Sequence, residues 1–117
     1  KMKKKKKIAI LGSTGSIGKQ TIDLIRKDKK NFEILLLTAN NNYNLLSKQI
    51  REFKVKNVII TNKRSYLILK KKFKNIFIYN DLNIIDKIIP SKLKDSVQLN
   101  KKNIQKILQK MNCSKQL

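Results

Sequence analysis

Several residue types are scarce or absent in this chain of 117 residues, and each scarcity removes a class of function. There is no histidine, which excludes nucleophiles built on a Ser-His or Cys-His pair and removes the commonest metal ligand. The single cysteine, Cys113, can form no disulfide within the chain and has no partners for a metal site. No apolar run approaches the roughly 20 residues that cross a bilayer. These absences predict a cytoplasmic protein without a membrane span.

Acidic residues are also few, because 7 Asp and Glu stand against 29 Lys and Arg, for a formal net charge of +22. Most of the positive charge is lysine, and the accompanying abundance of Asn and Ile is typical of an AT-rich genome. The alternative is a basic nucleic-acid-associated α/β domain without catalysis, or a surface for an acidic membrane. Nucleic-acid surfaces usually combine arginines with exposed aromatic rings. The only arginines here are Arg26, Arg51 and Arg64, so the composition disfavours nucleic acid as a partner.

Glycine is restricted to one place, since all three glycines lie within residues 12–18, directly after the apolar run 8–11. An apolar strand, a glycine-rich turn and a helix together form the phosphate cradle of α/β folds. We expect Gly12 to turn the chain off the strand and Gly15 to let the backbone approach a pyrophosphate. Gly18 is expected to let the helix pack close to the sheet.

The glycine turn has two alternative interpretations. A P-loop would need glycine at position 13, which is serine, and a Ser or Thr after Lys19, where the chain has Gln20. The hydroxyl that holds Mg²⁺ is therefore misplaced, and the pattern disfavours an NTPase. The other interpretation is a turn with no ligand, although tight strand–helix turns rarely need three glycines. A dinucleotide site is the interpretation that the spacing favours.

Apolar strands alternate with helical patterns as far as Pro90. Repeated βα units of this kind predict a Rossmann-like α/β fold, a parallel sheet of at least four strands with helices on both faces. The strands are expected at residues 8–11, 34–37, 58–60 and 76–78, and the helices at about residues 16–29, 42–53, 63–73 and 81–89.

The end of the second predicted strand bears on which dinucleotide binds. NAD sites usually carry Asp or Glu there, to hold the ribose 2′-hydroxyl. This chain has no acid at that point and continues with Asn40, Asn41 and Asn42, which permits a 2′-phosphate and therefore NADPH. Asparagine amides can donate to phosphate oxygens, and Lys48 adds positive potential. The alternative is that the three asparagines form only a helix-capping loop.

Residues 10–18 read Ile-Leu-Gly-Ser-Thr-Gly-Ser-Ile-Gly, with Thr21 and Asp23 in the helix that follows. This string resembles the opening of the 1-deoxy-D-xylulose 5-phosphate reductoisomerase family, NADP-dependent oxidoreductases of the non-mevalonate route to isoprenoids. The resemblance covers about residues 5–89 and implies NADPH as the cofactor. It implies pyrophosphate contacts from Thr14, Gly15, Ser16 and Ile17. It further implies that Asn40, Asn41 and Asn42 lie where the family contacts the 2′-phosphate.

The later part of the chain departs from the family. The family continues into an Asn-Lys-Glu-Ser segment that contacts substrate and nicotinamide, then into Asp and Glu ligands for Mg²⁺ or Mn²⁺, and none of these is present. We therefore expect no catalytic and no metal-binding residue in this chain. Residues 5–90 are interpreted as an NADPH-binding Rossmann-like domain and residues 91–117 as a non-matching, lysine-rich tail, helical in part. The chain is interpreted as the N-terminal part of an enzyme that is a homodimer when complete, and as inactive alone.

Overall fold

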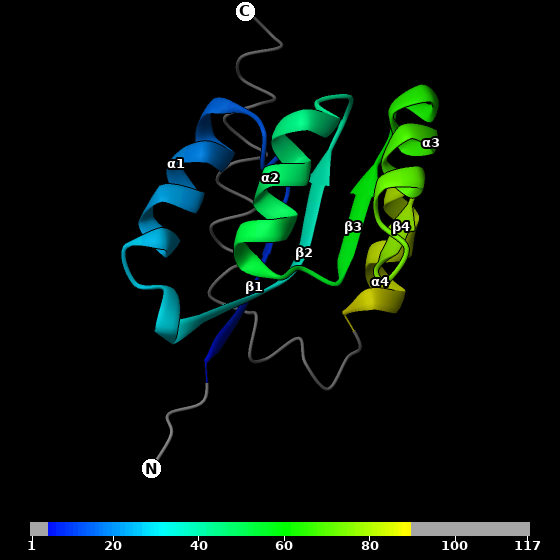
Figure 1. Ribbon diagram of the computed structural model, residues 1–117. Coiled ribbons are helices and arrows are strands. Elements are labelled where there is room, and N and C mark those ends of the chain that lie inside the picture. Colours follow the sequence, from blue (N-terminus) through cyan, green and yellow to red (C-terminus); the bar gives the residue numbers. More distant parts are fainter. Residues whose placement is uncertain (1–4, 90–117) are drawn as a thin grey trace, which may run out of the picture.

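A four-stranded parallel sheet lies at the centre of the computed structural model, which describes residues 5–89 (Figure 1). The strands are β1 (Lys6–Ile10), β2 (Phe32–Ala39), β3 (Asn57–Ile60) and β4 (Phe77–Tyr79). The helices are α1 (Ser16–Arg26), α2 (Tyr43–Phe53), α3 (Lys63–Lys72) and α4 (Ile85–Ile88), with short 3₁₀ turns at Lys29–Asn31 and Leu82–Ile84. All three strand pairings are parallel, which confirms the predicted Rossmann-like α/β sheet.

The strands pair in the order in which they occur in the chain, β1-β2-β3-β4. The pairing of β1 with β2 shifts by one residue after Ile8, because Ile8 lies opposite Ile34 whereas Ala9 lies opposite Leu36. Because all the pairings are parallel, the carboxyl ends of the strands meet at one edge of the sheet. The glycine turn and the asparagines also lie at this edge.

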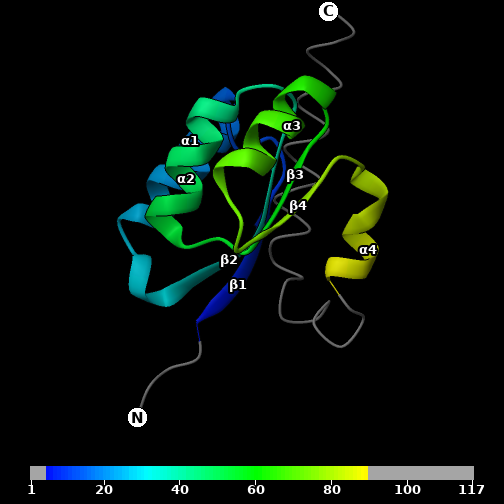
Figure 2. The same cartoon turned by 45° about the vertical axis from the view of Figure 1, so that its right-hand side comes forward.

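The two faces of the sheet are covered unequally (Figure 2). Because each crossover steps in the same direction, right-handed connections place α1, α2 and α3 together on one face. The larger core lies beneath these three helices, with Ile22, Leu46 and Leu69 as their most buried apolar contributions. On the other face, Ala9, Leu36 and Ile59 pack with isoleucines of α4 and its flanks. Helices on both faces, as predicted, explain why the middle of β2 is apolar without alternation.

The first helix is shorter than the sequence pattern predicts. It ends at Arg26 instead of residue 29, and a 3₁₀ turn follows at Lys29–Asn31. The reason is local, because the Asp28 carboxylate accepts a hydrogen bond from the Asn31 amide at 2.7 Å, and the Asp28 carbonyl accepts one from the Asn31 N–H. Such side-chain turns compete with helix hydrogen bonds. The predicted tail, residues 91–117, lies outside the described residues.

Candidate nucleotide-binding site

The glycine turn joins the carboxyl end of β1 to the start of α1. Gly12 has a φ of +69°, the left-handed conformation that favours glycine, so it reverses the chain as predicted. The N–H of Gly15 donates to the carbonyl of Gly12 at 3.1 Å and closes the turn. Ser13 is fully buried, whereas Gly15 and Ser16 are exposed at the edge of the sheet.

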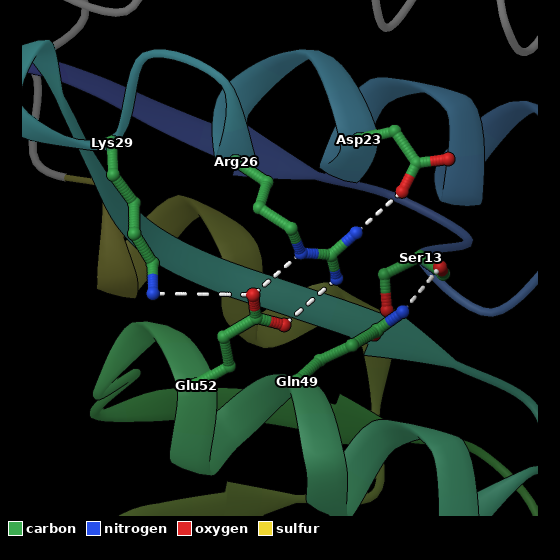
Figure 3. A network of polar contacts seen from close by, with 6 residues as sticks. All are labelled: Ser13, Asp23, Arg26, Lys29, Gln49 and Glu52. Atoms are coloured by element: carbon green, nitrogen blue, oxygen red, sulfur yellow. Dashed lines mark hydrogen bonds and ion pairs between the residues drawn. The ribbon is translucent and has the colours of Figure 1, made fainter.

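Three hydrogen bonds hold the first half of the turn in place. The N–H of Gly12 donates to the hydroxyl of Thr38 at 2.9 Å, and the N–H of Ser13 donates to the Thr38 carbonyl at 2.9 Å. The side chain of Gln49 reaches from α2 and donates from Nε2 to the carbonyl of Ser13 at 2.9 Å (Figure 3). Sequence reasoning missed Thr38 and Gln49. The signal for Gln49 is a polar residue inside the apolar stripe that Leu46 and Ile50 define.

The two remaining glycines have different reasons to lack a side chain. A Cβ at Gly18 would lie 2.0 Å from the Gly12 carbonyl oxygen and 2.6 Å from the Ser13 Cα. Gly18 therefore lets the helix approach the turn itself, not the sheet as expected from the sequence. A Cβ at Gly15 would meet only the Gly12 oxygen, at an ordinary 3.5 Å. Within residues 5–89 nothing requires glycine at this position, and these residues leave the space beside Gly15 open.

The first turn of α1 offers free hydrogen-bond donors. No side chain caps this helix, and the N–H groups of Thr14, Ser16 and Ile17 donate to no group within the described residues. The first turn also holds no acidic residue, and the positive end of the helix dipole lies there. Unpaired N–H groups at a helix start, with a side-chain-free approach over Gly15, form an arrangement that binds phosphate groups.

The three asparagines after β2 serve different purposes. The Asn42 side-chain oxygen accepts the Leu45 N–H at 3.1 Å and caps α2, as the capping alternative proposed. The Asn40 side-chain oxygen accepts the Thr61 hydroxyl at 2.8 Å. The side chain of Asn41 is exposed and makes no hydrogen bond to any described residue, although its carbonyl accepts from the Ser65 hydroxyl. Since the bonded atoms of Asn40 and Asn42 are oxygens, all three amide NH₂ groups remain as donors at this edge.

The far ends of α1 and α2 are joined by ion pairs (Figure 3). The Arg26 guanidinium donates to both oxygens of Glu52, one of them at 2.7 Å, and also to Asp23. The hydrogen bond from Arg26 lowers the pKa of the Glu52 carboxyl below its usual range. Lys29 approaches the same carboxylate at 3.9 Å. These contacts link α1, which follows the glycine turn, to α2, which contains Gln49.

Within residues 5–89, no three His, Cys, Asp or Glu side chains come together as a metal site. No helix in this part of the chain has the length and apolar character needed to cross a membrane.

Comparison with known proteins gives a consistent result. Residues 8–101 match the family model described as 1-deoxy-D-xylulose 5-phosphate reductoisomerase. The enzyme of that name from Pelagibacter ubique (strain HTCC1062) is 51% identical over 85 residues, which is 71% of this chain and 22% of the relative. That from Thermoanaerobacter sp. (strain X514) is 64% identical over 55 residues, covering 47% of this chain and 14% of the relative.

Solved structures of the same enzyme also match. The reductoisomerase from Zymomonas mobilis in complex with NADPH superposes with a TM-score of 0.66 at 25% identity, covering 74% of this chain and 23% of that one. A reductoisomerase in complex with NADPH, fosmidomycin and magnesium gives a TM-score of 0.65 at 26% identity, covering 72% and 21%. The chain thus spans about a fifth of the length of the relatives that it matches. A nucleic-acid-associated domain is not favoured by any of these matches.

Proposed function

Because the chain belongs to the 1-deoxy-D-xylulose 5-phosphate reductoisomerase family, we propose that residues 5–90 form the NADPH-binding domain of such an enzyme. In this proposal the complete enzyme acts in the cytoplasm, in isoprenoid biosynthesis by the non-mevalonate pathway. The family match itself continues to residue 101, beyond the domain end that the sequence predicts. The observation that carries the proposal is the uncapped start of α1, where three N–H groups lack a partner within the described residues.

The pyrophosphate of NADPH is assigned to the glycine turn. The N–H groups of Thr14, Ser16 and Ile17 donate to its oxygens, and the hydroxyls of Thr14 and Ser16 add further donors. Gly15 leaves room for the phosphates, since no part of the described protein fills the position of its missing Cβ. When bound, the cofactor supplies the hydride for reduction. The part of this site is to hold and orient it.

The adenosine 2′-phosphate is assigned to the asparagines after β2. The side-chain oxygens of Asn40 and Asn42 accept hydrogen bonds from Thr61 and Leu45. The amide NH₂ groups of both asparagines are therefore left as donors. Asn41 is exposed and its side chain makes no bond to a described residue, so its amide is the most accessible of the three. The absence of a carboxylate here favours a phosphate, because an acid would repel it.

Catalysis and metal binding are assigned to parts of the enzyme beyond residues 5–90. The described residues bring together no group of carboxylates able to hold Mg²⁺ or Mn²⁺. One of the matching reductoisomerase structures is a complex with NADPH, fosmidomycin and magnesium. In our proposal the metal site belongs to the remainder of the enzyme. The 117-residue chain is therefore expected to bind NADPH but to give no turnover of deoxyxylulose phosphate.

The test is a titration of NADPH fluorescence with the 117-residue chain and with Gly15→Val. We expect Gly15→Val to abolish binding, because the branched side chain occupies the space assigned to the pyrophosphate. The fold should survive, since Gly15 has φ −80° and ψ 174°, an extended conformation that valine adopts readily. Circular dichroism and thermal unfolding provide the control for folding. Equal binding by both proteins would show that the glycine turn is not the site.

A further inference from the structure

We propose that Gln49 is a positioning residue for the cofactor turn, an inference that rests on the proposed function of that turn. Gln49 belongs to α2, and the residue is only 3% exposed. Its Nε2 donates to the carbonyl of Ser13 at 2.9 Å, between residues far apart in the sequence (Figure 3). Among the described residues, this is the contact through which the helical layer holds the glycine turn by a side chain.

Packing alone does not explain an amide at this position. The Gln49 Oε1 is buried without a hydrogen-bond partner among the described residues, and so is the Ser13 hydroxyl. Burying an unpaired polar atom is unfavourable, whereas an apolar side chain would continue the stripe formed by Leu46 and Ile50 at no such cost. The bond to the Ser13 carbonyl is therefore the feature that distinguishes glutamine from a residue of similar shape.

The geometry of the peptide group links that bond to the ligand. The Ser13 carbonyl and the Thr14 N–H belong to one planar trans peptide, in which the two groups point in opposite directions. A carbonyl held toward Gln49 therefore directs the Thr14 N–H away from α2, toward the side on which the pyrophosphate is assigned. Thr38 fixes the preceding N–H groups of Gly12 and Ser13. Gln49 fixes the peptide whose rotation would withdraw a donor from the cofactor.

The first experiment compares Gln49→Met with the unaltered 117-residue chain. Methionine keeps the length of the side chain but donates no hydrogen bond, so the peptide after Ser13 is no longer held. We expect NADPH to bind about fivefold to tenfold more weakly, the loss that one net hydrogen bond produces. The unfolding temperature should change by less than about 4 °C, because the lost bond is offset by removal of the unpaired Oε1.

Ser47→Ala provides the matched control. Ser47 is buried on the same helix, and its hydroxyl donates to the Tyr43 carbonyl at 2.6 Å without contacting the turn. This variant also loses one side-chain hydrogen bond, a partly buried one, but its affinity for NADPH should stay within about twofold of the unaltered chain. A merely structural role for Gln49 predicts the opposite, namely that affinity follows stability in both variants.

Gln49→Glu adds a readout that packing does not affect. A protonated carboxyl can still donate to the Ser13 carbonyl, whereas an ionised one cannot. Burial raises the pKa of a carboxyl at this position, and the neighbouring carboxylates of Asp23 and Glu52 act in the same direction. The cations of Lys19, Arg26 and Lys48, which line the same hollow, act in the opposite direction. We expect the affinity of Gln49→Glu for NADPH, relative to the unaltered chain, to fall as pH rises from about 6 to 9. The relative affinity of Gln49→Met should not vary over that range.

The outcomes separate the inference from its premise. Failure of the unaltered chain to bind NADPH would overturn the proposed function and this inference with it. Binding by the unaltered chain and by Gln49→Met within twofold of each other would overturn the inference alone. If Gln49→Met fails to fold, the pH dependence of Gln49→Glu decides, and a flat relative affinity counts against a positioning role.

Discussion

Helices α1 and α2 begin at the same edge of the sheet, but their first turns satisfy their N–H groups differently. In α2 the Asn42 side chain caps the helix, and in α3 Asn62 does the same for the N–H of Ser65. In α1 the corresponding residue is Gly15, which has no side chain to offer. At α2 and α3 an asparagine side chain accepts one of these N–H groups. At α1 the protein leaves them unpaired within the described residues, which is the condition that an anion requires.

The largest expected effect comes from closing the space that lets α1 approach its turn. Gly18→Ala would place a Cβ 2.0 Å from the Gly12 carbonyl oxygen, and all three atoms within 3.0 Å of it belong to the backbone. We expect a loss of about 3 kcal/mol in the free energy of unfolding, measured by urea denaturation. Gly15→Ala is the matched control and should change stability by less than about 0.5 kcal/mol. Equal losses in the two variants would contradict the contrast between these glycines.

The next prediction concerns the asparagine that caps α2. Asn42→Ala removes the acceptor of the Leu45 N–H, so we expect the chain to lose about 1 kcal/mol of unfolding free energy. Asn41→Ala removes an exposed side chain with no bond to a described residue and should be nearly neutral. Chemical denaturation of both variants makes the comparison. A larger loss for Asn41→Ala would mean that the capping assignment is wrong.

A smaller effect is expected when the asparagine loop is made basic. Asn41→Lys adds a positive charge where the 2′-phosphate is assigned, and the affinity for NADPH relative to NADH should rise about threefold to fivefold at low salt. The control is Asn75→Lys, the same change at an exposed position shortly before β4, at the opposite edge of the sheet. An equal rise in both variants would point to the overall charge of the protein instead of this loop.

The smallest expected effect concerns the ion pair between Arg26 and Glu52, at the C-terminal ends of α1 and α2. The pKa of Glu52 is lowered in the folded protein by the hydrogen bond from Arg26, so the ion pair stabilises the fold above the ordinary pKa of glutamate. That stabilisation is lost as the pH falls through the lowered pKa. Because Arg26 is 45% exposed, we expect Glu52→Gln to lose no more than about 0.5 kcal/mol at pH 7. The difference should vanish near pH 2, and unfolding measured at both pH values checks the sign.

The sequence predicted the order of elements well because its apolar runs are sharply bounded. It also predicted the turn at Gly12, where the structure has a φ of +69°. It did not predict that Gly18 faces the turn, nor that Thr38 and Gln49 hold it. The hydrogen bonds of Thr38 and Gln49 join residues 26 and 36 positions apart, and no local pattern specifies them. The early end of α1 was missed because the turn between Asp28 and Asn31 is decided by two short side chains.

The match between strand order and chain order has a consequence for how the site comes into being. Since β1 pairs with β2, β2 with β3 and β3 with β4, each strand finds its partner in the segment synthesised next to it. During synthesis the N-terminal part of a domain leaves the ribosome first. The peptides of the glycine turn are held by hydrogen bonds to Thr38 and Gln49, and both residues precede β3 in the chain. The side chains that hold the donors of α1 therefore leave the ribosome before β3 and β4 do.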